Sequence, residues 1–265
     1  MRTRMRSCRG TSGTRPRRAR RPMPLTSLAD GLFGERYGSG PIRVVALHGW
    51  GRDRRDFRRV LEGLDAVAVD LPGFGATPPP VAASGADGYA RMVAAWLEQL
   101  SGPQVLVGHS FGGRVAVVLA ATRPELVTGM VLVGVPLLHR LDRTGRRPSV
   151  AYRLVRLANR AGLISDERLE REKRRRGSAD YRAATGVMRD TLVRVVNESY
   201  EDRLPEVACP VRLVWGTADS EVPPEVAHRA AALLRNVDME VVEGCGHDLP
   251  REAPERIRAA IEALA

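Results

Sequence analysis

The sequence predicts a doubly wound α/β protein, with a mostly parallel sheet and an inserted helical cap. Strand-like and helix-like segments alternate regularly, and the strand candidates are apolar on both faces, as expected for strands covered on each side by helices. One long segment, residues 137–205, interrupts the alternation and contains no strand candidate. The chain has 265 residues, of which 43% are hydrophobic, so it is long enough for one large domain with such an insert.

The first half of the predicted core contains three strand–helix pairs. Each strand candidate is a β-branched run closed by glycine or a Pro-Gly turn, and each helix candidate repeats apolar residues at helical spacing. The strands are predicted at 42–49, 66–73 and 104–110, and the helices at 53–64, 89–100 and 111–121.

The second half continues the alternation on both sides of the insert. A strand predicted at 126–134 precedes the insert, and strands at 211–216 and 239–244 follow it. Helices are predicted at 223–234 and 250–264. We therefore expect residues 25–136 and 206–265 to form the core.

Residues 137–205 are predicted to form the cap over one edge of the sheet. Helical periodicity is expected at 150–161, 166–176 and 181–196. A segment of this length is too long for an ordinary connection between core elements. It is also basic, with 17 Lys and Arg against 10 Asp and Glu.

Most of the net charge of +11 lies in residues 1–24, which hold nine arginines and no acidic residue. We expect this segment to be a disordered tail, with Met23 as a possible true start; an anion-binding arm and a targeting segment are the alternatives. The apolar region that a secretory signal needs does not follow its charges. Because most of the positive charge lies in this segment, nucleic-acid binding is expected only through the tail.

Apolar runs and cysteines limit the remaining classes. The longest apolar stretch without a charge, residues 126–138, is shorter than the roughly 20 residues of a membrane-spanning helix. Cys8, Cys209 and Cys245 share no metal-ligand spacing and do not form the pattern of a disulfide framework. We therefore expect no membrane span and a reducing, cytoplasmic setting.

The sequence Gly108-His109-Ser110-Phe111-Gly112 lies between a predicted strand and a predicted helix. A serine at such a sharp turn has a strained backbone, and small residues two positions before and after it avoid clashes. Because a serine hydroxyl is a weak nucleophile, it needs a base and an orienting acid elsewhere in the chain.

Asp219 and His247 are the candidates for the acid and the base. Each follows a predicted strand, and the carboxyl ends of parallel strands meet at one edge of a sheet. The order Ser110, Asp219, His247 is that of hydrolases with a nucleophile on a strand–helix turn. Glu221 is the nearby substitute for Asp219.

These residues resemble the α/β-hydrolase fold superfamily, in its capped branch, over about residues 25–265. The sequence His48-Gly49-Trp50-Gly51 is similar to the family's oxyanion turn, so the resemblance implies that the amides of Trp50 and Phe111 bind the oxyanion. It also implies that His48, Gly49, Gly108 and Gly112 support the two turns, with His109 packed beside the serine. No cofactor or metal is expected.

The resemblance implies a serine hydrolase acting on a carboxylic ester or thioester through an acyl-enzyme. A carbon–carbon bond hydrolase of ring-cleavage products and a non-catalytic binding module on the same fold are the alternatives. The arginines at 171 and 174–176 could attract an anionic substrate or an acidic partner, although a solvated helix face also explains them. The sequence does not indicate the acyl chain, the leaving group or the oligomeric state.

Overall fold

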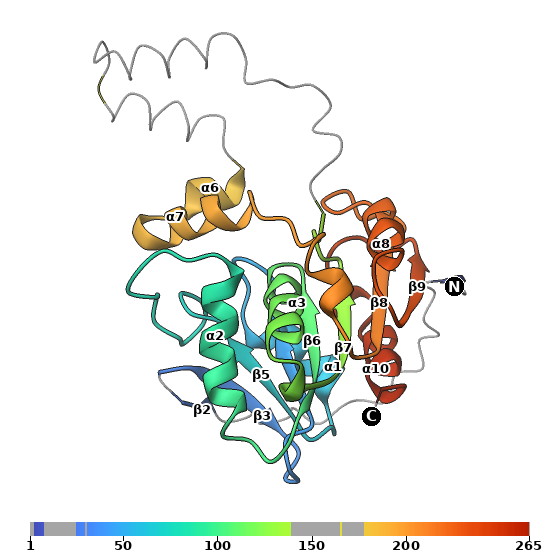
Figure 1. Cartoon of the computed structure of the whole chain (residues 1–265), viewed down its shortest axis with the longest axis horizontal. Coiled ribbons are helices and arrows are strands. Elements are labelled where there is room, and N and C mark those ends of the chain that lie inside the picture. The colour runs from blue at the N-terminus through green and yellow to red at the C-terminus, as the bar shows by residue number, and fades with distance from the viewer. Residues whose placement is uncertain (1–2, 8–24, 30, 139–164, 166–177, 265) are drawn as a thin grey trace, which may run out of the picture.

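The computed structural model describes residues 3–7, 25–29, 31–138, 165 and 178–264. Its strands form one nine-stranded sheet in the order β1-β9-β8-β7-β6-β4-β5-β3-β2. Neighbouring strands from β1 to β5 are parallel, whereas β3 runs antiparallel to both β5 and β2. The predicted doubly wound, mostly parallel sheet is confirmed (Figure 1).

The strands are short, and those in the centre of the sheet are buried. They are β1 (Thr3–Ser7), β2 (Leu25–Ser27), β3 (Phe33–Tyr37), β4 (Val44–Leu47), β5 (Ala66–Asp70), β6 (Gln104–His109), β7 (Val127–Val133), β8 (Val211–Gly216) and β9 (Val237–Glu243).

Helices connect these strands. Among the described residues, the α-helices are α1 (Arg58–Leu61), α2 (Ala86–Leu97), α3 (Phe111–Thr122), α6 (Ala179–Ala183), α7 (Gly186–Val195), α8 (Pro224–Ala231), α9 (Leu249–Glu252) and α10 (Pro254–Glu262). The same part of the chain contains the 3₁₀ turns η1 (Arg54–Phe57), η2 (Pro124–Leu126) and η3 (Leu204–Glu206). No helix among the described residues is long and apolar enough to cross a membrane.

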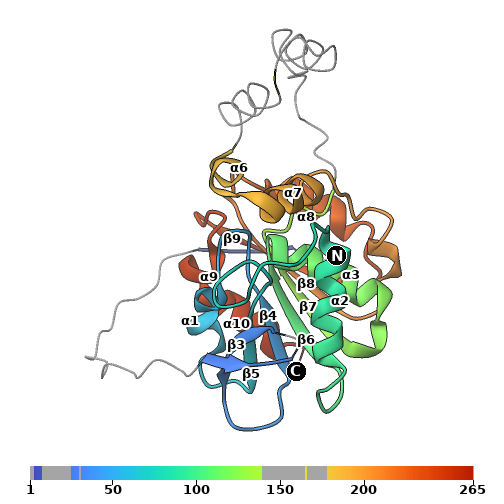
Figure 2. The same cartoon turned by 90° about the vertical axis from the view of Figure 1, so that its left-hand side faces the viewer.

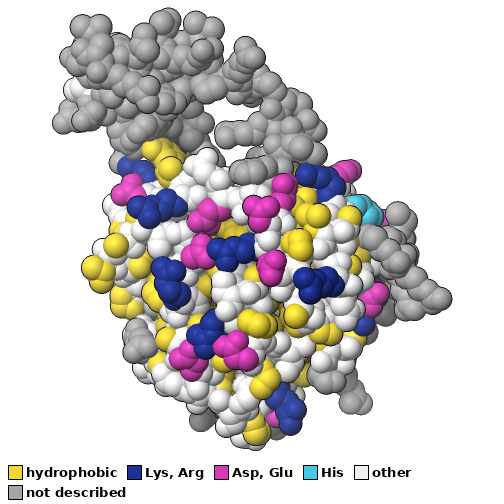
Figure 3. All heavy atoms as spheres, in the orientation of Figure 1, with side chains coloured by type: hydrophobic (Ala, Val, Ile, Leu, Met, Phe, Trp, Pro, Cys, Tyr) yellow, Lys and Arg dark blue, Asp and Glu magenta, His cyan; other side chains and the backbone are white. Residues whose placement is uncertain are grey.

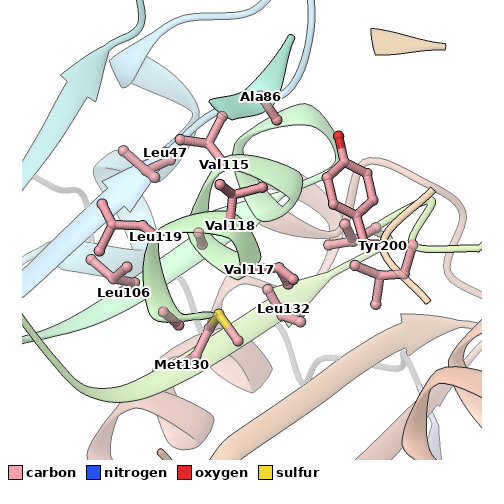
Figure 4. Packing of buried hydrophobic residues seen from close by; sticks show 14 of the residues in the cluster. Leu47, Ala86, Leu106, Val115, Val117, Val118, Leu119, Met130, Leu132 and Tyr200 are labelled. Atoms are coloured by element: carbon pink, nitrogen blue, oxygen red, sulfur yellow. The ribbon is translucent and has the colours of Figure 1, made fainter. Parts of the chain in front are cut away.

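Two apolar layers cover the two faces of the sheet. Alternate strand residues such as Leu106 and Leu132 pack against α2, α3 and α8, and Figure 4 shows them beneath Val115 and Val118 of α3. The intervening residues, such as Val107, pack against α1, α9 and α10 on the other face (Figure 2). Burial on both faces explains why the central strands are apolar at consecutive positions.

The edges of the sheet contain strands that the sequence pattern did not indicate. The hairpin β2–β3 extends the sheet beyond β5, and Glu35 is buried there beneath Arg58, with an Nη2–Oε2 distance of 3.0 Å. At the opposite edge, Thr3–Ser7 of the expected tail forms β1 beside β9. The remainder of the tail lies outside the described residues.

Several helices are shorter than predicted for local reasons. The helix predicted at 53–64 is one 3₁₀ turn followed by the four residues of α1. The helix predicted at 250–264 is divided because Ala253 precedes Pro254, and a residue before proline disfavours the helical conformation. The helix predicted at 181–196 is α6 and α7, separated by the extended residues Ala184 and Thr185.

Within the predicted cap, α6 and α7 lie across the carboxyl ends of the strands (Figures 1 and 2). The helices expected at 150–161 and 166–176 lie outside the described residues, so the boundaries of the cap stay a prediction. On α7, Met188 contacts Tyr89 with an Oη–Sδ distance of 3.9 Å, and Arg114 of α3 donates a hydrogen bond to the Val195 carbonyl. These contacts hold α7 over α2 and α3.

Glu198, just after α7, also supplies the N-terminal cap that α2 lacks. The N-cap residue Gly85 has no side chain to accept a hydrogen bond, and the Ala86 amide donates instead to Glu198 Oε2 at 3.1 Å. The Tyr200 hydroxyl donates to the same oxygen at 2.5 Å. A carboxylate at this point also interacts favourably with the helix dipole.

We expect Glu198→Ala to lower the free energy of unfolding by about 1–2 kcal/mol, because it removes both hydrogen bonds at the start of α2. Urea denaturation followed by circular dichroism measures this change. Glu206→Ala, at an exposed residue of η3, is the control and should change it by less than about 0.5 kcal/mol. Equal stabilities of the two variants would contradict the capping role.

Candidate active site

Ser110 lies at the junction of β6 and α3 in a strained backbone conformation. Its φ of 48° and ψ of −110° make it the one non-glycine residue with positive φ in the described part of the chain. The Ser110 amide donates to the Val133 carbonyl of β7 at 2.9 Å, which fixes the turn to the sheet. Such strain concentrates at functional sites and persists only where the surrounding structure enforces it.

Gly108 and Gly112 allow this turn because neither position has space for a side chain. A Cβ on Gly108 would lie 2.4 Å from the Gly113 Cα, and one on Gly112 would lie 2.1 Å from the Leu47 carbonyl oxygen. Both neighbours are backbone atoms, so no side-chain movement could relieve the clash. The two glycines therefore stand where the sequence analysis expected small residues.

The turn after β4 is fixed by His48. This buried imidazole donates from Nδ1 to the Gly49 carbonyl at 2.8 Å, and its Nε2 accepts from the Leu71 amide at 3.0 Å. Burial lowers the pKa of His48, which keeps the imidazole neutral, as these two hydrogen bonds require. His48 thus joins the turn after β4 to the end of β5.

The amides of Trp50 and Phe111 donate no hydrogen bond to any other described residue. The two side chains pack against each other, with ring centroids 5.4 Å apart, so the turn after β4 lies beside the start of α3. The Phe111 amide is also at the N-terminus of a helix of 12 residues, where the dipole favours negative charge. Two amide donors are therefore available close to Ser110.

Asp219 and His247 meet at the carboxyl ends of β8 and β9. Asp219 is buried; its Oδ1 accepts from the amides of Glu221 and Val222, and its Oδ2 lies 2.8 Å from His247 Nδ1. Burial lowers the pKa of His247, but the hydrogen bond and the charge of Asp219 outweigh burial and raise it above 6.5. The carboxylate therefore orients the imidazole and stabilises its cation.

Ser110 and His247 line one pocket of about 760 Å³ beneath α6 and α7. About half of its described wall is apolar, and its charged side chains among the described residues are one guanidinium and three carboxylates. The apolar residues are Trp50, Phe111, Pro136, Leu138, Leu192, Val193, Val195, Val196 and Val222, and the charged ones are Arg114, Asp180, Glu198 and Glu221. The pocket thus brings the predicted serine and histidine together below the predicted cap.

His109 supports His247 from below. Its Nε2 donates to the His247 carbonyl at 2.9 Å, and the two rings are 5.0 Å apart. Its Nδ1 is buried and accepts no hydrogen bond from any described residue. Burial, followed by the charge of His247, lowers the pKa of His109 to about 4.

Sequence reasoning missed three features around this site. Arg52 donates to Asp248, the residue after His247, from a position 196 residues earlier in the chain, and no local pattern signals such a pair. Glu221 lies 3.7 Å from His247 Nε2, and the sequence analysis considered it only as a substitute acid. Cys245 is disulfide-bonded, which the spacing of the cysteines did not indicate.

The sequence also matches known proteins in the region that forms this site. Residues 44–260 match the model of the alpha/beta hydrolase family. The chain therefore belongs to the alpha/beta hydrolase family, which confirms the resemblance and the hydrolase class. The match includes the turns at Trp50 and Ser110 and the residues Asp219 and His247.

Curated relatives within this family differ in reaction. The lipase LipV of Mycobacterium tuberculosis is 32% identical over 88% of this chain and 97% of its own length. The 2-hydroxy-6-oxononadienedioate/2-hydroxy-6-oxononatrienedioate hydrolase of Burkholderia vietnamiensis is 30% identical over 86% of this chain and 88% of its own. A putative lipase from Acinetobacter baumannii has the same fold, with a TM-score of 0.68 and 22% identity over 90% of this chain and 89% of its own.

We expect His109 and His247 to titrate on opposite sides of pH 6.5, although their rings are neighbours. Long-range ¹H–¹⁵N NMR against pH measures both pKa values, with His109→Asn and His247→Asn assigning the signals. Because the pKa of His109 is about 4 when folded and about 6.5 when unfolded, its contribution to stability is complete above pH 6.5 and declines towards pH 4. A His109 pKa near 6.5 would contradict the buried, neutral imidazole.

Proposed function

We propose that the protein is a serine hydrolase that cleaves a carboxylic ester or thioester through an acyl-enzyme on Ser110. The observation that carries this proposal is the strained turn of Ser110 in a pocket shared with His247, whose Nδ1 is held by the buried Asp219. Membership of the alpha/beta hydrolase family supports the hydrolase class. The assignment to an ester or thioester is the proposal.

In the first half of the reaction, Ser110 Oγ forms a bond to the substrate carbonyl carbon while His247 Nε2 takes the hydroxyl proton. The carbonyl electron pair moves to oxygen, where the amides of Trp50 and Phe111 stabilise the oxyanion. Collapse of this intermediate breaks the bond to the leaving alcohol or thiol, which takes the proton from His247. Asp219 stabilises the imidazolium throughout.

In the second half, water attacks the acyl carbon and gives a proton to His247. A second oxyanion forms at the same amides and collapses to the carboxylic acid, and the proton returns to Ser110 Oγ. Because His247 must be neutral to accept each proton, the rate should rise with pH through its pKa, which lies above 6.5.

We expect a fluorophosphonate to label wild-type protein at Ser110 alone, and mass spectrometry of the peptides locates the adduct. Ser110→Ala should abolish labelling. Asp219→Asn should slow it by roughly 10³–10⁴-fold, because the imidazole loses its orienting partner. Asp238→Asn, at an exposed residue of β9, is the matched control and should leave the rate within twofold. An unlabelled wild type that remains folded would favour the binding-module alternative.

Carbon–carbon bond hydrolysis is the second candidate, because the relative from Burkholderia vietnamiensis is named as a hydrolase of 2-hydroxy-6-oxo dienedioates and trienedioates. The two candidates are separated by assaying a series of p-nitrophenyl esters beside a 2-hydroxy-6-oxo dienoic acid. Turnover of the esters with no loss of the dienoate absorbance would support the ester assignment. Faster turnover of the dienoate would replace it with the second candidate.

The charges of the described pocket favour neutral over anionic substrates. Three carboxylates and one guanidinium line it, whereas the arginines at 171 and 174–176, which could attract an anionic substrate, lie outside the described residues. Glu221 is the carboxylate whose oxygen lies 3.7 Å from the base nitrogen of His247. An anionic group bound near that nitrogen would be repelled by Glu221.

We expect Glu221→Gln to raise kcat/KM for an anionic monoester of a dicarboxylic acid about fivefold relative to a neutral ester of equal length. This corresponds to about 1 kcal/mol, the upper end for an exposed carboxylate such as Glu221. Steady-state kinetics at low and high salt measure the ratio, and salt should reduce the difference. Glu225→Gln, outside the pocket on α8, is the control. An unchanged ratio would show that Glu221 does not act on the substrate.

A further inference from the structure

Four charged side chains form a closed ring between the turn after β4 and the loop after β9. Arg52 donates from Nε to Asp56 Oδ2 at 2.5 Å and from Nη2 to Asp248 Oδ1 at 2.6 Å. Arg251 donates to Asp56 Oδ1 at 2.7 Å from Nη2, and its Nε lies 3.8 Å from Asp248 Oδ2. Positive and negative groups alternate around the ring, which is neutral as a whole.

The ring connects two loops that the sheet does not connect directly. The strands β4 and β9 are separated in the sheet by β6, β7 and β8. Arg52 follows the turn of Trp50, and its amide donates to the Gly49 carbonyl at 3.2 Å. Asp248 is adjacent to His247, and its carbonyl accepts from the amides of Arg251 and Glu252 at the start of α9.

Asp56 is the buried member of the ring, and Arg52 is the member that joins both loops. The side chain of Asp56 is 2% exposed, so its charge depends on the two guanidinium groups for compensation. Arg52 is 27% exposed and binds its two partners through different nitrogens, which fixes the plane of the guanidinium. Burial lowers the pKa of Arg52, but its bonds to Asp56 and Asp248 outweigh burial and raise it.

We propose that Arg52 and Asp248 are positioning residues that hold the His247 loop at a fixed distance from the turn of Trp50. His247 is then fixed at three points: its imidazole by Asp219, its carbonyl by His109 and its neighbour Asp248 by Arg52. The inference rests on the proposed function, because its consequence is faster attack by Ser110. Displacements of about 1 Å from reactive geometry can cost about 100-fold in rate.

The test is a double-mutant cycle on the rate of fluorophosphonate labelling. Arg52→Met and Asp248→Asn should each slow labelling by about 10- to 100-fold, and the double variant should be no slower than the slower single variant. Arg212→Met is the matched control, because it removes an arginine that is paired with Asp238 near the amino ends of β8 and β9, away from the site. Its labelling rate should stay within twofold of the wild-type rate. Additive losses in the double variant would overturn the clamp.

A second readout does not depend on activity. The His247 Nδ1 proton, hydrogen-bonded to Asp219, should give a downfield ¹H NMR signal that exchanges slowly with water. We expect faster exchange in Arg52→Met and Asp248→Asn and no change in Arg212→Met, with melting temperatures confirming that all variants are folded. Unchanged exchange in the first two variants would overturn the proposal even if labelling slowed.

The two readouts also separate this proposal from the proposed function. If the wild type is not labelled but shows the slow His247 signal, and Arg52→Met loses it, the clamp holds and the serine-hydrolase assignment fails. If the wild type is labelled at Ser110 and both variants match its labelling and exchange rates, the assignment holds and the clamp fails.

Discussion

The strained backbone of Ser110 is the constraint on which the arrangement of the site depends. A non-glycine residue at positive φ costs about 1–3 kcal/mol, and it persists because Gly108 approaches Gly113, Gly112 approaches Leu47, and the Ser110 amide bonds to β7. The apolar layers on both faces of the sheet hold β6 and α3 in the positions that require this turn. The strained turn places Ser110 at the carboxyl end of β6 and leaves the Phe111 amide at the N-terminus of α3.

The positions of the other site residues are set by the carboxyl ends of the parallel strands. Parallel strands bring their carboxyl ends together, so Asp219 after β8 and His247 after β9 meet although 28 residues separate them. Gly134, at the end of β7, leaves room for this pair: a Cβ there would lie 3.1 Å from His247 Nδ1 and 3.2 Å from Asp219 Oδ2. The glycine therefore gives the pair its space.

What the sequence could predict was local or periodic. The central strands were predicted because burial on both faces produces continuous apolar runs, and the strand at 211–216 was predicted to the residue. The edge strands β1, β2 and β3 were missed because their short sequences lack such a run and their partners lie far along the chain. The residues proposed for the triad are recognisable because a serine turn and strand ends have local signatures. The ring of Arg52, Asp56, Asp248 and Arg251 has none, since charged residues are frequent in this chain and only the fold selects which ones pair.

The net charge of the whole chain is opposite in sign to the charge of the described pocket. The net charge of +11 arises mainly in residues 1–24, and Figure 3 shows acidic and basic side chains interspersed on one face of the described core. Within the pocket the described charges are mostly carboxylates, and one of them, Glu198, also caps α2 and binds Tyr200. A structural requirement thus places a negative charge beside the site. Total charge is therefore a poor guide to the substrate, because a ligand responds to the groups within about a Debye length of the pocket, roughly 8–10 Å.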